Sequence, residues 1–351
     1  MQPRARFVRR NDLRPLGRIV EKRLKKPLNL NYMKNLLYSL LAAATLCSCS
    51  QNPSSNETMV SNPKDTLQVY LCIGQSNMVG AARPESQDSV VPERFINLSA
   101  VDDVDRKKGE WRLAVPPLCR HSTGLCPVDY FGRTMLEHLP ENVSVGVIHV
   151  AVDGTAIRIY DKDQCKGYCD SIQPDWMVNE INFYDRNPYA RLIEMAKLAQ
   201  QKGTIRGILL HQGCTDAYSD GWCRTVKKIY GDILSDLNLQ AENVPLLVGE
   251  TAGIDQQGVC QHANPTIDRI HDFIPTAWTI SSRGCTVSDD HVHFAAEGYR
   301  LLGTRYGLRM LQLQGYDVAD STDCRLQTEV AASADSTRAT DVDFSNPLER
   351  N

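Results

Sequence analysis

Short, nearly continuous apolar runs recur through the middle of the chain, and segments with helical spacing lie between them. The runs predict five strands, at 67–73, 143–151, 205–211, 244–249 and 277–280. Strands that are apolar at nearly every position are typical of sheets buried on both faces, so we expect a parallel sheet.

Three stretches repeat apolar residues at i, i+3, i+4 and i+7, which predicts helices at 188–203, 226–237 and 299–310. Alternating strands and helices favour one α/β domain, a three-layer α/β/α sandwich around a central parallel sheet, spanning 65–315. Residues 316–351 are rich in Asp, Ser, Thr and Ala without a sustained period, so we expect a disordered tail there.

Residues 33–48 have the layout of a secretory signal. A basic start at Met33-Lys34-Asn35 precedes an apolar run at 36–46, and small residues follow it. The run is too short for an ordinary membrane span, which needs about 20 residues.

The end of this signal, Leu46-Cys47-Ser48-Cys49, resembles the lipobox of bacterial lipoproteins, in which the last Cys is lipidated and becomes the first mature residue. We therefore expect a lipid on Cys49, a polar tether over 49–64, and an exported lipoprotein at the periplasmic or outer cell surface. Residues 1–32 would then be an over-extended N-terminus, with translation starting at Met33. The alternative is a true basic arm in front of an internal signal.

Composition excludes several classes of protein. Hydrophobic residues make up 42% of the chain and charged residues 23%, values that argue against global disorder, collagen and multi-span membrane proteins. The net charge of −3 averages two unlike parts: residues 1–32 hold ten basic and two acidic residues, whereas the chain from Cys49 onward holds 28 basic and 40 acidic ones. An acidic body argues against a nucleic-acid partner, because phosphate binding needs a basic face.

Ten of the 12 cysteines remain once Cys47 and Cys49 are assigned to the signal, and an exported protein can oxidise them. Connectivity cannot be read from sequence, but spacing makes four pairs plausible. These pairs are Cys119–Cys126, Cys165–Cys169, Cys214–Cys223 and Cys260–Cys285. Zinc is the competing interpretation, and the lack of any CxxC pair disfavours it.

Two loops that follow predicted strands carry small residues suited to a site at the carboxyl edge of the sheet. Ser76, in Gly74-Gln75-Ser76-Asn77-Met78, directly follows a strand, where a Ser can be presented as a nucleophile with its own N–H aimed at a developing oxyanion. Gly154 follows the next long strand and can offer an unobstructed N–H. The alternatives are an ordinary helix N-cap for Ser76 and a simple turn for Gly154.

Two further loops carry polar side chains. Gln212 follows His211 at a strand end, and its amide can donate to an oxyanion, although a capped turn is the alternative. Asp290 and His293 are three residues apart, a spacing that lets the carboxylate orient the imidazole. His291 and His293 with a carboxylate could instead bind zinc or iron, but no third ligand cluster lies nearby, so we expect no metal and no cofactor.

Together the four loops supply a nucleophile, oxyanion donors and an acid–base pair, which is the inventory of serine acyl transfer. The chain also resembles the SGNH hydrolases, in the sialate O-acetylesterase-like and acetylxylan esterase-like branch, over about 67–312. The resemblance rests on four blocks in order: Gly74 to Met78, Gly154, His211-Gln212-Gly213, and Asp290 to Phe294.

The resemblance implies an SGNH/flavodoxin-like fold and assigns the roles. Ser76 would be the nucleophile, His293 the base and Asp290 the orienting acid, with the N–H groups of Ser76 and Gly154 and the side chain of Gln212 as the oxyanion hole. The substrate would be an O-acetylated carbohydrate, such as acetylated xylan or a sialic acid-type glycan, and no cofactor is implied.

There is one departure from the family pattern. Many relatives read His-Gln-Gly-Glu, whereas this chain has Cys214 in place of the Glu, which in some relatives is the triad acid. Two other hypotheses therefore stay open: a same-fold esterase or lipase acting on non-carbohydrate esters, and a non-catalytic glycan-binding lipoprotein derived from an esterase.

Overall fold

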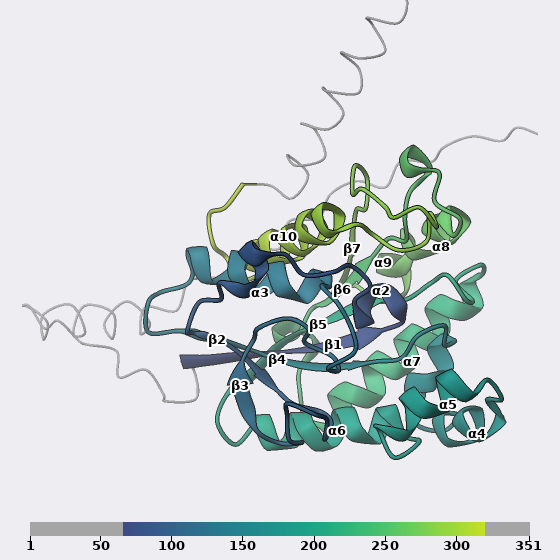
Figure 1. The fold of residues 1–351 in the computed structure, drawn as a ribbon, viewed down its shortest axis with the longest axis horizontal. Coiled ribbons are helices and arrows are strands. Elements are labelled where there is room, and N and C mark those ends of the chain that lie inside the picture. The colour runs from purple at the N-terminus through teal and green to yellow at the C-terminus, as the bar shows by residue number, and fades with distance from the viewer. Residues whose placement is uncertain (1–65, 320–351) are drawn as a thin grey trace, which may run out of the picture. The chain divides into compact units, whose positions relative to one another are not determined.

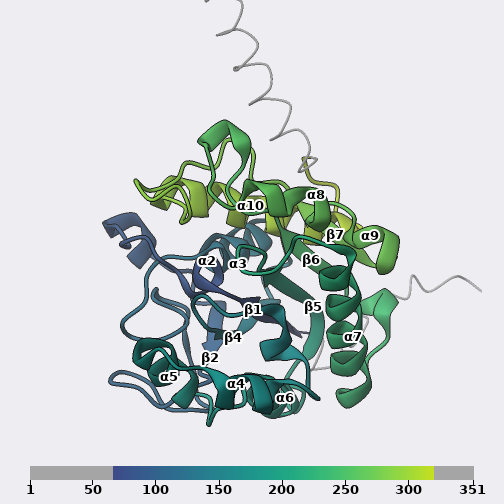
Figure 2. The same ribbon diagram turned by 90° about the vertical axis from the view of Figure 1, so that its right-hand side faces the viewer.

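The computed structural model describes residues 66–319, and these form a sheet with helices on both faces (Figures 1 and 2). The expected signal, the lipid on Cys49, the tether and the tail beyond residue 319 lie outside the described residues. Within them, no helix is long and apolar enough to cross a membrane.

The sheet has seven strands in the order β3-β2-β4-β1-β5-β6-β7. The strands are β1 (Leu67–Gly74), β2 (Phe95–Leu98), β3 (Trp111–Leu113), β4 (Ser144–Ala151), β5 (Thr204–His211), β6 (Leu246–Gly249) and β7 (Ala277–Ile280). Every neighbouring pair is parallel except β2 and β3. The predicted α/β sandwich with a central parallel sheet is thus confirmed, and all five predicted strands are present within one or two residues.

Strands β2 and β3 were not predicted, because each is short and interrupted by a strongly polar residue. They have four and three residues, with Asn97 within β2 and Arg112 within β3, so neither forms a continuous apolar run. The antiparallel β3 lies at one edge of the sheet, and its side chains are half-buried or exposed, so it lacks the continuous apolar run that marks the central strands.

Helices connect the strands and cover both faces of the sheet. The α-helices are α2 (Ser76–Val79), α3 (Pro127–His138), α4 (Cys165–Ser171), α5 (Asp175–Asn182), α6 (Pro188–Ala199), α7 (Asp220–Asp236), α8 (Asn264–Ile267), α9 (Ile270–Phe273) and α10 (Ala296–Leu313). Short 3-10 turns lie at η2 (Ser86–Ser89), η3 (Ile157–Tyr160), η4 (Ala241–Asn243), η5 (Ile254–Gln256) and η6 (Gln261–Ala263).

Three of these helices, α6, α7 and α10, correspond to the predicted ones, whereas α3 was missed. Its signals are present in the sequence, with Pro127 at the first turn and the Asp129 carboxylate accepting from the Cys126 N–H at 2.9 Å.

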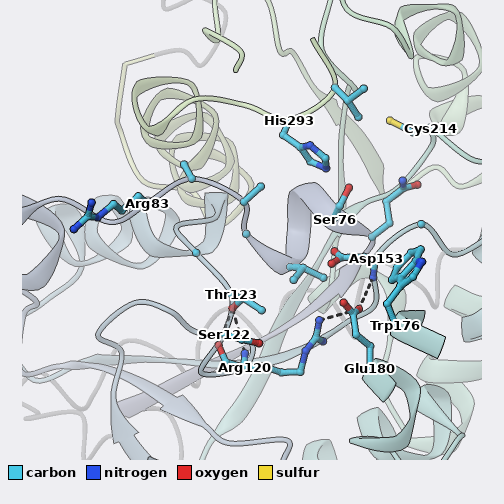
Figure 3. Close-up of a pocket in the computed structure, with 18 of the residues that line it drawn as sticks. Ser76, Arg83, Arg120, Ser122, Thr123, Asp153, Trp176, Glu180, Cys214 and His293 are labelled. Atoms are coloured by element: carbon cyan, nitrogen blue, oxygen red, sulfur yellow. Dashed lines mark hydrogen bonds and ion pairs between the residues drawn. The ribbon is translucent and has the colours of Figure 1, made fainter. Parts of the chain in front are cut away.

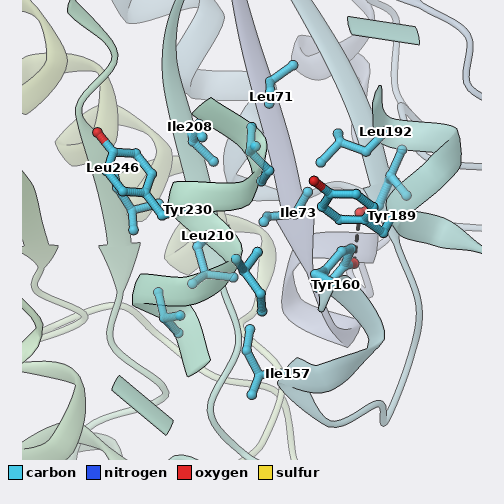
Figure 4. Packing of buried hydrophobic residues seen from close by; sticks show 14 of the residues in the cluster. Leu71, Ile73, Ile157, Tyr160, Tyr189, Leu192, Ile208, Leu210, Tyr230 and Leu246 are labelled. Atoms are coloured by element: carbon cyan, nitrogen blue, oxygen red, sulfur yellow. Dashed lines mark hydrogen bonds between the residues drawn. The ribbon is translucent and has the colours of Figure 1, made fainter. Parts of the chain in front are cut away.

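The side chains of β1 alternate between two hydrophobic cores. Leu71 and Ile73 point into the core shared with helices α6 and α7, while Tyr70 and Cys72 point into the core shared with α3 and α10. Figure 4 shows the first core, where Tyr160 lies against the end of β1. The Tyr160 hydroxyl donates to the Gly74 carbonyl at 2.8 Å and accepts from the Gly74 N–H at 3.1 Å. This buried contact holds the carboxyl end of the central strand in place.

The register places three strand ends side by side. Gly74, the last residue of β1, is paired with Ala151 of β4 on one side and with His211 of β5 on the other. The loops that follow these three strands carry Ser76, Gly154 and Gln212, so the strand order alone gathers three of the predicted site residues at one edge.

Candidate active site

Ser76 begins the short helix α2 immediately after the central strand. The turn between them depends on Gly74, which has φ +157° and no room for a side chain, since an added Cβ would lie 2.2 Å from the His211 carbonyl oxygen. The Gln75 N–H donates to that same carbonyl at 3.0 Å. The half-buried Ser76 side chain therefore faces a cavity of about 860 Å³ at the carboxyl edge of the sheet.

Asp290 and His293 lie on the turn before α10, and they form the predicted pair. The Asp290 Oδ2 lies 2.6 Å from the His293 Nδ1. Its other oxygen accepts from the backbone N–H groups of Val292 and His293 at 2.8 and 2.9 Å, and from the Ser288 hydroxyl at 2.8 Å. Burial alone would raise the pKa of Asp290, but these hydrogen bonds outweigh it and hold the pKa well below its usual range. The carboxylate is thus ionised at neutral pH and fixes the imidazole.

Ser76 and His293 line the same cavity, and their side chains point toward one another (Figure 3). Among residues 66–319, none forms a hydrogen bond with the Ser76 hydroxyl. The hydrogen bond between a nucleophile and its base is often long before substrate binds and shortens in the complex. Two other polar residues of this region, His211 and Asp216, have structural roles instead. His211 is buried, which lowers its pKa to about 4, and Asp216 accepts from Gln212 and from the Ile157 N–H.

Gly154 lies in the turn after β4, with φ +65°, a backbone conformation that glycine adopts readily. An added Cβ would lie 3.2 Å from the Trp176 ring, so a side chain here would crowd the cavity wall. The turn is held from both sides: the Asp153 N–H donates to Glu180 at 3.0 Å, and the Thr215 hydroxyl donates to the Gly154 carbonyl at 3.1 Å. Gly154 lines the cavity that Ser76 faces.

Gln212 is placed differently from the prediction. Its amide nitrogen donates to the Thr155 carbonyl at 3.2 Å and to Asp216 at 2.6 Å, and its oxygen accepts from the Trp222 Nε1 at 2.5 Å. Because both amide hydrogens already have acceptors and the side chain is buried, Gln212 braces the loop after β5 in this structure. It does not line the cavity beside Ser76.

Gln75 was not singled out from the sequence, yet it does line the cavity. Its side-chain oxygen accepts from the Gly213 N–H at 3.1 Å, which orients the amide next to Ser76. Within residues 66–319 the amide nitrogen of Gln75 has no acceptor. Gln75 therefore presents the free side-chain donor that the sequence assigned to Gln212.

The wall opposite His293 contains a buried ion pair between Arg120 and Glu180, drawn with dashed lines in Figure 3. Nitrogen and oxygen lie 2.9 Å apart. Burial raises the pKa of Glu180 to about 7, with the Arg120 guanidinium opposing the shift. Trp176 lies on the same wall and is 52% exposed, a large exposed fraction for an indole in a cavity.

All nine cysteines between residues 66 and 319 are free thiols in the structure. The structure does not support the predicted Cys214–Cys223 and Cys260–Cys285 pairs, because the Cys214 and Cys260 thiols lie close enough to shift each other's pKa. Cys223 instead donates to the Thr266 carbonyl at 3.3 Å, and Cys285 lies 3.6 Å from the Arg305 guanidinium.

The other two expected pairs differ from one another. Cys119 contacts Tyr184 and the Ala151 carbonyl, at 3.4 and 3.7 Å, whereas Cys126 interacts with Asp129 at the start of α3. The structure gives this pair no support. Cys165 and Cys169 lie one turn apart on α4 and shift each other's pKa, so a disulfide between them stays a prediction.

Three carboxylates gather elsewhere, at Asp161, Asp163 and Asp232, in a grouping that could hold a cation. The Lys228 ammonium forms ion pairs with all three, at 2.7, 2.7 and 2.8 Å. The lysine thus occupies the place of a metal ion.

Comparison with known proteins gives a family match and similar folds. The family model described as carbohydrate esterase, sialic acid-specific acetylesterase matches residues 66–312. An X-ray structure of an Arabidopsis thaliana protein is similar with a TM-score of 0.54 and 16% identity, covering 72% of this chain and 99% of that one. The structure of NanS is similar with a TM-score of 0.53 and 13% identity, covering 72% and 99%. At these identities the two structures support the fold.

Proposed function

The chain belongs to the sialic acid-specific acetylesterase family of carbohydrate esterases, and we propose that it removes O-acetyl groups from sugars by serine catalysis through an acyl-enzyme. The observation that carries the proposal is the shared cavity in which Ser76 faces His293, with Asp290 bonded to the far side of the imidazole at 2.6 Å. Nucleophile, base and orienting acid are the parts that serine acyl transfer needs.

In the proposed reaction the Ser76 Oγ attacks the acetyl carbonyl carbon while His293 takes the hydroxyl proton. Asp290 stabilises the imidazolium that forms, because it is ionised and bonded to Nδ1. His293 then gives the proton to the departing sugar oxygen, which leaves an acetyl ester on Ser76. A water molecule, activated by His293 in the same way, releases acetate and restores the enzyme.

The negative charge that develops on the carbonyl oxygen needs donors beside Ser76. We assign the backbone N–H groups of Ser76 and Gly154 to this role, together with the side-chain amide of Gln75. Gln75 is preferred to Gln212 because its amide nitrogen has no acceptor within the described residues, whereas Gln212 must give up one of its two existing hydrogen bonds to donate.

A sugar substrate fits the exposed indole of Trp176, which lines the cavity against Gly154. Pyranose rings present a flat face of C–H groups that packs on aromatic rings, and the surrounding hydroxyls need polar partners. The walls supply these in Asp153, Ser122 and Thr123.

The Asp290–His293 bond also favours catalysis over passive glycan binding. The hypothesis of a non-catalytic protein arose from Cys214, which replaces the Glu of many relatives. Because Asp290 supplies an orienting carboxylate from another loop, the replacement at position 214 leaves the pair complete. We propose further that the protein acts as an exported lipoprotein anchored through Cys49.

The experiment is an acetate-release panel with the wild-type protein and Ser76→Ala. The substrates are an O-acetylated sialic acid, acetylated xylan, and p-nitrophenyl esters with acetyl and octanoyl groups. Ser76→Ala should lose several orders of magnitude in rate while keeping its melting temperature, since a small side chain fits at the strand end. A wild-type protein inactive on every ester would support the binding hypothesis, and a preference for octanoyl would support a lipase.

Trp176→Ala separates sugar recognition from chemistry in the same panel. We expect kcat/KM on the acetylated sugar to fall roughly tenfold or more, with turnover of p-nitrophenyl acetate within about twofold of wild type. Equal losses on both substrates would mean that Trp176 only supports the Gly154 turn.

A further inference from the structure

Two thiols from separate loops meet beside the candidate active site. Cys214 follows β5 in the loop that begins with Gln212, and Cys260 lies in the segment between β6 and α8. The two thiols lie close enough that each shifts the pKa of the other. Cys214 is half-buried and lines the cavity that Ser76 faces, as Figure 3 shows, whereas Cys260 is only 7% exposed.

The backbones of these two loops are also packed together around the thiols. The Thr251 hydroxyl donates to the Cys260 carbonyl at 2.9 Å, and its methyl group lies 3.3 Å from the position of a Cβ on Gly213. On the other side, the Tyr218 ring stacks on His262 with centroids 4.8 Å apart, and the Tyr218 hydroxyl donates to the Cys214 carbonyl. Contacts on both sides keep the two cysteines from moving apart.

The segment that contains Cys260 also supports the catalytic turn, residues 290–293, which carries Asp290 and His293. The Val259 N–H donates to the His291 carbonyl at 2.9 Å, and the His291 Nδ1 lies 2.9 Å from the Gln256 carbonyl. His291 lies between Asp290 and His293. A covalent link between Cys214 and Cys260 would therefore fasten the loop after β5 to the support of the catalytic turn.

We propose that Cys214 and Cys260 form a disulfide bond in the exported protein, closing a loop from residue 214 to residue 260 beside the active site. This inference goes beyond the esterase activity and does not depend on it. In the reaction, one thiolate attacks an external disulfide and releases one thiol, and the second thiolate displaces the other. The S–S bond forms as the external disulfide takes two electrons and two protons and becomes two thiols.

The local chemistry is consistent with this exchange. The interaction between the two thiols lowers the pKa of Cys260 and raises that of Cys214, so the thiolate of the pair is held on Cys260 and Cys214 is the accessible partner. Cys214 can meet a small disulfide through the cavity. The remaining pair in contact, Cys165 and Cys169, is buried on one turn of α4 and would close a loop of a few residues, which constrains the unfolded chain far less.

Peptide mapping tests the bond directly. The full chain, with its signal, is exported, purified without reductant, alkylated and digested with trypsin together with a protease that cleaves before Asp, because trypsin alone leaves Cys214 and Cys223 in one peptide. We expect a cross-linked pair of peptides containing Cys214 and Cys260, with Cys223 and Cys285 alkylated. Alkylation of both Cys214 and Cys260, even after incubation with oxidised glutathione, would overturn the proposal, as would a bond from Cys214 to Cys223.

Thermal unfolding with and without reductant gives an independent measure. Reduction should lower the wild-type melting temperature by roughly 5–10 °C, since the closed loop is long. Cys214→Ser, Cys260→Ser and the double variant should all show this lower value and no further response to reductant. Cys223→Ser, which removes a buried thiol outside the pair, should keep the full response. A wild-type melting temperature unaffected by reductant, or losses that add in the double variant, would contradict the bond.

Discussion

The Asn77 side-chain amide donates a hydrogen bond to the Val292 carbonyl at 2.9 Å, and so links the residue after the candidate nucleophile to the residue before the candidate base. The Asn77 oxygen accepts from the Phe294 N–H at 3.1 Å and from the Tyr299 hydroxyl at 2.8 Å. Asn77 is buried and makes three side-chain hydrogen bonds to the segment from Val292 to Tyr299, so it sets the spacing between α2 and the turn that carries Asp290 and His293.

Asn77→Ala should therefore damage catalysis and stability together. The buried Phe294 and Tyr299 and the half-buried Val292 each lose a hydrogen bond, which costs about 1–3 kcal/mol for a buried group that stays unsatisfied. We expect the melting temperature to fall by several degrees and kcat to fall roughly tenfold or more, because the His293 position relaxes. Asn142→Ala, at an exposed loop, is the matched control and should behave as wild type. An Asn77→Ala variant with wild-type kcat would show that the turn holds its position without this link.

Asp290→Asn should remove the orienting acid with little harm to the fold. An Asn side chain retains the oxygen that accepts from Val292, His293 and Ser288, but loses the carboxylate that binds the imidazole. We expect the rate to fall roughly a hundredfold or more at a nearly unchanged melting temperature. Asp289→Asn, one residue away, should be mild. If Asp289→Asn were the inactive variant, the assignment would be off by one residue.

Gln75→Ala should lower the catalytic rate, whereas Gln212→Ala should lower stability. Removing an oxyanion donor typically costs about a hundredfold in kcat with little change in KM, and we expect this for Gln75→Ala. Gln212→Ala removes the partner of Asp216, Trp222 and the Thr155 carbonyl, so it should lower the melting temperature by several degrees. A Gln75→Ala variant with full kcat would return the oxyanion role to Gln212.

The Arg120–Glu180 pair should leave a signature in the pH dependence of stability. The Glu180 carboxyl has a native pKa of about 7 against an ordinary 4.5, so between these values the folded protein binds more protons than the unfolded chain. The contribution of Glu180 to the free energy of unfolding is therefore largest below pH 4.5 and decreases as the pH rises toward 7. Above pH 7 this contribution is smaller by at most about 3 kcal/mol than below pH 4.5.

Glu180→Gln removes this titration and retains an oxygen for the Asp153 N–H. The melting temperature of wild type relative to the variant should accordingly decrease as pH rises from 5 to 8. An increase over the same range would mean that the attraction of Arg120 outweighs burial and keeps the carboxylate ionised at low pH.

The local pattern of apolar and polar residues was sufficient to predict much of the fold. The central strands are buried on both faces, so their apolar runs are unmistakable, and the register of β1 with β4 and β5 then brings Ser76 and Gly154 to one edge. The Asp290–His293 pair is three residues apart in a tight turn, which makes it visible in sequence. Strands β2 and β3 were missed because each is short and interrupted by a strongly polar residue, Asn97 or Arg112.

What the sequence by itself determined is thus the set of contacts between near neighbours: strands, helices and the Asp290–His293 pair. Only the tertiary structure decided which distant groups meet. Asn77 bonds to Val292, which is 215 residues away in the sequence. The Gln212 side chain is bonded to Trp222 and Asp216, whereas the Gln75 amide nitrogen has no acceptor within the described residues. Cys214 lies near Cys260 because β5 and β6 are adjacent in the sheet. The physical reason is that hydrogen bonds and thiol contacts depend on distance in space, and the order of strands in a sheet sets that distance independently of spacing along the chain.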